Sequence, residues 1–145
     1  MAISLHRGDL PADLSFGPVV AIDTETMGLN PHRDRLCLVQ LSAGDGNAHL
    51  VQIPRGPIKA PRLAALIADP KVLKLFHFGR FDIAVLEHAL GVHCEPVYCT
   101  KIAAKLDVLL EREGRTELAH AAFRFLPTRA RLDIAGWPET DIFAH

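Results

Sequence analysis

Two acidic residues near the start of the chain have the spacing of a metal site. Asp23 and Glu25 follow an apolar, β-branched run at residues 18–22, which predicts a buried strand. Because side chains two positions apart on a strand point the same way, both carboxylates are expected on one face. A divalent cation between them would relieve their repulsion, and such oxygen ligands suit Mg²⁺ or Mn²⁺. The alternative is an exposed acidic strand end that only starts the next turn.

A third acid, Asp82, comes directly after Phe81 at the start of a predicted apolar helix. A strand and a turn with Gly79 precede it. An acid in the first helical turn is favoured by the helix dipole, so simple capping is the alternative interpretation. The order of elements favours the metal site, because it would bring acids from separate elements together. This order is a strand that ends in Asp-x-Glu, two further strands, and then a strand, a turn and the helix that carries Asp82.

Four basic residues lie close in sequence to these acids and could contact phosphates. They are Arg33, Arg35, Arg80 and Lys101. Basic side chains of this kind position a nucleic-acid backbone without reading its bases. The alternative is that they are solvated surface charges.

The elements that must position these residues indicate an α/β fold. Strands are expected at residues 18–23, 36–41, 49–53, 72–76 and 95–99, and helices at 61–69, 81–90, from 100 onward, and at 116–125. Three strands in succession predict an antiparallel meander, with a tight hairpin at residues 44–47. Helices and strands then alternate. We therefore expect a three-layer fold with a mixed five-stranded sheet and helices on both faces.

Composition favours one soluble domain. A chain of 145 residues with 49% hydrophobic content can bury one core. Sixteen basic against seventeen acidic residues give a net charge of −1, so nucleic-acid contacts must be local. Three cysteines without a CxxC pair argue against a disulfide framework. No run reaches membrane-spanning length, so a cytoplasmic protein without membrane partners is expected.

Several segments together resemble the DEDD exonuclease superfamily, with ribonuclease D as the most similar branch. Residues 21–29 (AIDTETMGL) and 77–82 (HFGRFD) are similar to its first and second motifs. Residues 35–42 and 97–101 also match at the expected places, and the resemblance spans residues 5–105. It implies a ribonuclease H-like fold and a 3′-5′ exonuclease with two Mg²⁺ or Mn²⁺ ions, which acts on single-stranded RNA or DNA 3′ ends.

The resemblance also implies roles for individual residues. Asp23 would bridge both ions, Glu25 would bind one ion and approach the terminal 3′ hydroxyl, and Asp82 would hold the second-motif position. The expected substrate-binding residues are Thr24, Met27, Gly28, Leu29, His77, Phe78 and Phe81, of which Met27 to Leu29 match the loop that packs against the terminal nucleotide. Phe78 stands where the family often has Asn, so a polar contact near the scissile phosphate is not expected.

The third motif of the superfamily is missing. It requires an Asp that follows Tyr by four residues or His by five, and no such pair occurs after Asp82. His77 has this spacing to Asp82, but Asp82 already fills the second motif. The tail from residue 106 resembles the extreme C-terminus of short bacterial ribonuclease D-like proteins, which indicates a deleted or omitted segment near residues 105–106.

Two functions follow from this pattern. The first is a metal-dependent exonuclease of the ribonuclease D type, in which a second copy or one of Asp107, Asp133 and Asp141 could replace the missing ligand. A homodimer is therefore a possible assembly. The second is a catalytically degenerate nuclease-like domain that binds nucleic acid or a protein partner. An unrelated α/β domain with acidic strand ends is the third interpretation.

Overall fold

The computed structural model describes residues 2–112 of the chain. Contacts divide the chain into two units, Met1–Lys105 and Leu106–His145. The expected single domain with a junction near residues 105–106 remains a prediction. The helix expected at 116–125 and the acids Asp133 and Asp141 lie outside the described residues, as does the side chain of Asp107.

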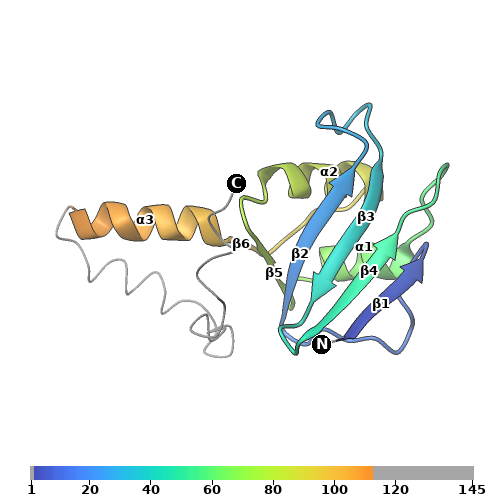
Figure 1. The fold of residues 1–145 in the computed structure, drawn as a ribbon, viewed down its shortest axis with the longest axis horizontal. Helices are drawn as coiled ribbons and strands as arrows, with labels where there is room; N and C mark the ends of the chain where they lie inside the picture. Colours follow the sequence, from blue (N-terminus) through green and yellow to red (C-terminus); the bar gives the residue numbers. More distant parts are fainter. Residues whose placement is uncertain (1, 113–145) are drawn as a thin grey trace. The chain divides into compact units, whose positions relative to one another are not determined.

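A mixed sheet of six strands forms the centre of the first unit (Figure 1). The strands are β1 Ala2–Arg7, β2 Val19–Thr26, β3 Leu36–Ser42, β4 Asn47–Gln52, β5 Leu73–Phe76 and β6 Val97–Cys99. Their order is β1-β4-β3-β2-β5-β6. The meander β2-β3-β4 is antiparallel, whereas β1 joins β4, β5 joins β2 and β6 joins β5 in parallel. All five expected strands are present, and the α/β class is confirmed.

The strand that the sequence did not predict is β1, at the edge of the sheet. Its residues are exposed or half-buried, and Ile3 and Leu5 are largely exposed. The strand therefore lacks the continuous apolar run by which a buried strand is recognised. Pairing with β4 along its whole length, which the sequence alone does not reveal, defines it as the sixth strand.

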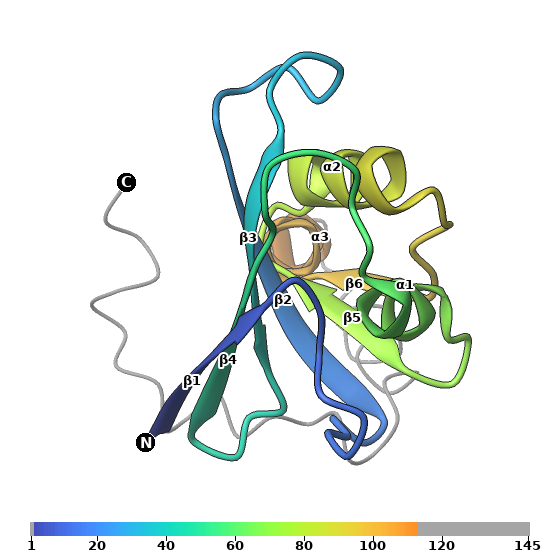
Figure 2. The same cartoon turned by 90° about the vertical axis from the view of Figure 1, so that its right-hand side faces the viewer.

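Two helices of the first unit lie on the same face of the sheet (Figure 2). They are α1 Pro61–Ala68, which opens with proline as expected, and α2 Arg80–Leu90, which ends at left-handed Gly91. Their buried residues join one core with the inward residues of the sheet. Helix α3, Thr100–Arg112, follows β6 directly. None of the helices within residues 2–112 is long and apolar enough to cross a membrane.

The alternation of β2 decides where the acids lie. Val20, Ile22 and Thr24 are buried beneath the helices, whereas Asp23 and Glu25 are exposed on the opposite face. The apolar core thus fixes the register of the strand and so the direction of its carboxylates. Of the chain described, neither α1 nor α2 covers that second face (Figure 2).

Candidate active site

Asp23 and Glu25 lie near the carboxyl end of β2, in the middle of the sheet. As predicted, they share one face of the strand. Gln40 is the cross-strand partner of Asp23 on β3, and its Nε2 donates a hydrogen bond to Asp23 Oδ2 at 3.1 Å. The register of β2 against β3 then shifts between Glu25 and Thr26. The strand therefore presents both carboxylates immediately before the irregularity that ends its regular pairing.

Asp82 is bound to the same strand from the first turn of α2. Its Oδ1 accepts a hydrogen bond from the Thr24 amide at 3.1 Å and a second from Thr24 Oγ1 at 2.6 Å. Thr24 stands between the other two acids and is buried, so Asp82 is fixed beside them. No side chain caps the start of α2, where Gly79 is the N-cap. The hydrogen bonds of Asp82 thus connect α2 to β2, which the capping alternative does not explain.

The charges of the three acids act on one another. The pKa of Asp23 is raised above its usual value, mainly because the surrounding protein atoms desolvate the carboxylate, and then because Asp82 and Glu25 are negatively charged neighbours. The hydrogen bond from the Thr24 amide acts in the opposite direction but does not cancel them. Separate elements therefore gather negative charge around Asp23, and a cation placed there would relieve the repulsion.

The donor chemistry of this cluster fits a hard divalent cation, but the cluster is not a finished ligand set. Carboxylate oxygens are the ligands that Mg²⁺ and Mn²⁺ prefer. Within residues 2–112, however, no three His, Cys, Asp or Glu side chains are arranged to hold a metal ion. One oxygen of Asp82 is already engaged by Thr24. Binding of a metal would thus require side-chain rearrangement or a ligand from outside the described residues.

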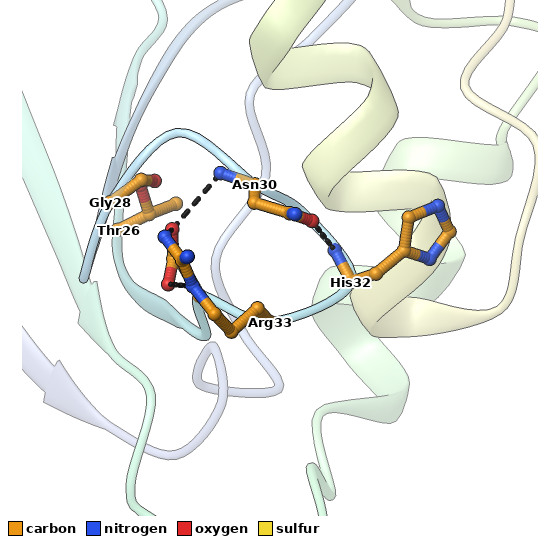
Figure 3. A network of polar contacts seen from close by, with 6 residues as sticks. Thr26, Gly28, Asn30, His32 and Arg33 are labelled. Atoms are coloured by element: carbon orange, nitrogen blue, oxygen red, sulfur yellow. Dashed lines mark hydrogen bonds and ion pairs between the residues drawn. The ribbon is translucent and has the colours of Figure 1, made fainter.

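A tightly bonded loop, residues 27–35, follows the two strand acids (Figure 3). Asp34 organises it by accepting hydrogen bonds from the Asn30 amide at 3.0 Å and from Arg33 Nε at 2.7 Å. These contacts lower the pKa of Asp34 to about 2, with the Arg33 hydrogen bond as the largest cause. A side chain at Gly28 would collide with the Asp34 carboxylate and force it to shift from its hydrogen bonds. Sequence reasoning missed Asp34, because no motif marks it.

The rest of the predicted substrate-binding residues lie in two places. Met27 and Leu29 are exposed by 64% and 85% on the loop after β2. His77 and exposed Phe78 occupy the turn between β5 and α2, where His77 Nδ1 lies 2.9 Å from Thr100 Oγ1. Phe81 differs from these, because it is partly buried and packs against the core.

The basic residues near the acids are used in different ways. Arg33 is paired with Asp34, and Arg35 Nη1 donates to the carbonyls of Ile53 at 3.0 Å and Leu36 at 3.3 Å. Both side chains therefore already have partners within the protein. Arg80 is exposed at the start of α2. The ammonium of Lys101 lies over the Phe78 ring, 3.8 Å from its centroid, a pairing that the sequence did not indicate.

Comparison with known proteins shows which family the chain is similar to. Residues 9–133 match the family described as 3'-5' exonuclease. Ribonuclease D of Nitrobacter hamburgensis is 31% identical over 110 residues, which cover 70% of this chain and 28% of that protein. The chain thus spans little more than a quarter of the length of this curated relative.

Two similar solved structures are of Brucella melitensis NrnC. The structure with bound Mg²⁺ is 44% identical to this chain and has a TM-score of 0.73, and the alignment covers 100% of each chain. The structure bound to pGG is also 44% identical, with a TM-score of 0.71, and 100% of this chain and 99% of that chain are covered. The fold is therefore the expected ribonuclease H-like α/β fold, and the chain belongs to the 3'-5' exonuclease family.

Proposed function

We propose that this chain is a metal-dependent 3′-5′ exonuclease that removes nucleotides from single-stranded RNA ends, in the manner of ribonuclease D. One observation carries the proposal: Asp23, Glu25 and Asp82 come together around Thr24, where desolvation and then the charges of Asp82 and Glu25 raise the pKa of Asp23. Mg²⁺ in one similar Brucella structure and pGG in another support a divalent metal and a nucleotide substrate.

The three acids would hold Mg²⁺ or Mn²⁺. Two such ions, when bound, supply the positive charge that activates a water molecule and stabilises the leaving 3′ oxygen. Gln40 orients Asp23 through its hydrogen bond, and Thr24 orients Asp82. The rigid loop after β2 presents Met27 and Leu29 to the terminal nucleotide, as the family resemblance implies.

The test is a time course with single-stranded RNA labelled at its 5′ end, in Mg²⁺ or Mn²⁺ and in chelator. Stepwise shortening from the 3′ end is expected only with metal, and Asp23→Ala should abolish it. Asp45→Ala is the matched control, because Asp45 lies in the exposed turn between β3 and β4, where it accepts hydrogen bonds from Asn47. Equal shortening by wild type and Asp23→Ala would refute the assignment of Asp23. The same series with DNA measures the sugar preference.

A second function is favoured by the missing third motif and by the incomplete ligand set of the described residues. In this alternative the chain is a degenerate nuclease-like domain that binds nucleic acid or a protein partner. Binding of the labelled RNA without shortening in either metal would support it. A ligand supplied by a second copy predicts instead that activity rises faster than in proportion to protein concentration, and that shortening accompanies a dimer in sedimentation.

A further inference from the structure

The turn between β5 and α2 holds Phe78 in an unfavourable conformation. Phe78 has φ of 59°, and no other residue except glycine has a positive φ in the described part of the chain. The left-handed region costs a residue with a side chain about 1–2 kcal/mol. Burial of the side chain does not offset this conformational energy, because the side chain is 56% exposed. Strain that is kept at an exposed aromatic residue points to a functional role.

Close packing beneath the turn fixes this conformation. Gly79 is buried against Phe76, and a side chain at Gly79 would collide with the Phe76 ring. The Arg80 amide donates a hydrogen bond to the Phe78 carbonyl at 2.8 Å, which closes the turn. Phe76 belongs to the core, so the backbone at Phe78 cannot relax without disturbing it. The fold therefore imposes the outward direction of the Phe78 ring.

The side chain of Lys101 lies against the Phe78 ring. Lys101 Nζ lies 3.8 Å from the ring centroid, in cation–π contact. The residues beside this pair are also joined, because Thr100 Oγ1 lies 2.9 Å from His77 Nδ1 and donates to the Phe76 carbonyl at 3.3 Å. The start of α3 is thereby tied to the turn. An exposed aromatic surface and a positive charge are thus held at one place, four residues before Asp82.

We propose that Phe78 stacks on an unpaired nucleobase near the 3′ end of the substrate, and that Lys101 neutralises a phosphate of the same strand. This inference rests on the proposed function and names the property by which the site selects its substrate. An aromatic ring can stack on any base, but only on one that is not paired in a duplex. Phe78 and Lys101 would therefore select single-stranded ends regardless of sequence. Phe78 directly precedes Gly79, the N-cap of α2, and Asp82 lies in the first turn of the same helix, so both residues belong to one end of α2.

The test is binding of short phosphorothioate oligonucleotides that carry a single 2-aminopurine, measured in chelator so that no cleavage occurs. Stacking on Phe78 should quench the fluorescence at one position of the strand and not at the others. Phe78→Leu should remove that quenching and weaken binding by about 5- to 150-fold, the range that corresponds to 1–3 kcal/mol for one stacked base. Phe78→Trp should retain both. Ile102→Ala is the matched control, because Ile102 is 62% exposed on α3 beside Lys101.

Lys101 is tested separately with Lys101→Met, which keeps the length of the side chain and removes its charge. The slope of log affinity against log salt should fall by about one, while the quenching remains. An unchanged slope would refute the phosphate contact. If Phe78→Leu does not fold, abasic sites placed one at a time in the oligonucleotide test the same contact with the wild-type protein, and one position alone should lose about tenfold in affinity.

The outcomes separate this inference from the proposed function. A protein that shortens RNA but quenches 2-aminopurine equally with Leu or Phe at position 78 would refute the stacking and leave the exonuclease intact. Position-dependent quenching that requires Phe78, in a protein that never shortens RNA, would support the stacking and refute the nuclease activity.

Discussion

Thr24 links the strand that carries two acids to the helix that carries the third, and removal of its hydroxyl tests whether that link positions Asp82. Thr24 is only 8% exposed, and its Oγ1 lies 2.6 Å from Asp82 Oδ1. The Thr24 amide donates to the same oxygen at 3.1 Å. Thr24→Val keeps the volume of the side chain and the amide bond but removes the shorter hydrogen bond.

The size of the effect follows from these contacts. A hydrogen bond to a charged group contributes about 1.5–3 kcal/mol to stability. Because Asp82 is half-buried and keeps its bond to the amide, the lower end, about 1.5 kcal/mol, is expected. The effect on function should be larger than this loss of stability implies, because removal of the partner that orients a metal ligand typically costs about 10- to 100-fold in metal affinity or activity.

The assay is a titration of RNA shortening with Mn²⁺, combined with thermal melting in chelator. Thr24→Val should require more Mn²⁺ and melt at a lower temperature, and Thr24→Ser, which restores the hydroxyl, should recover most of both. If Thr24→Val melts at the lower temperature but responds to Mn²⁺ like the wild type, Thr24 only stabilises the fold. The positioning of Asp82 through Thr24 would then be wrong.

Asp23, Gly28 and Lys74 each offer a further test through other contacts of the fold. The raised pKa of Asp23 lets the folded protein keep a proton that the unfolded chain releases, so without metal the folding stability should fall as pH rises above about 4. In Asp23→Asn, the melting temperature should fall less over the same pH range. Gly28→Ala should destabilise by about 1–3 kcal/mol in denaturant unfolding through collision with Asp34, and much of that extra cost should vanish in an Asp34→Ala background. Lys74→Met should lower the free energy of unfolding by about 2–5 kcal/mol in denaturant unfolding, because buried Lys74 donates to two main-chain carbonyls that would lose their partner. A loss of less than about 1 kcal/mol would contradict this.

The sequence predicted the elements with a strong local signal. The β-branched run before Asp23 gave strand β2, and its period of two placed both acids on one face. Pro61 and Gly91 marked the start of α1 and the end of α2. These features depend on neighbouring residues alone, so no knowledge of pairing was needed. Edge strand β1 lacks a buried apolar run, because none of its side chains is fully buried.

The contacts that complete the site could not be predicted, because they depend on register and on tertiary packing. Gln40 reaches Asp23 only because the two residues are paired across β2 and β3. Asp34 fixes its loop through a local bonding pattern that no motif marks. Lys101 meets Phe78 because β6 pairs with β5 and places the start of α3 beside the turn. The roles of the three acids as metal ligands remain predictions.

Anomalous diffraction from crystals soaked in MnCl₂ tests the assignment of those acids most directly. Manganese peaks are expected within ligand distance of the carboxylates of Asp23, Glu25 and Asp82, with the Asp82 side chain still bonded to Thr24 through one oxygen. Soaked crystals with no manganese at these carboxylates would contradict the assignment.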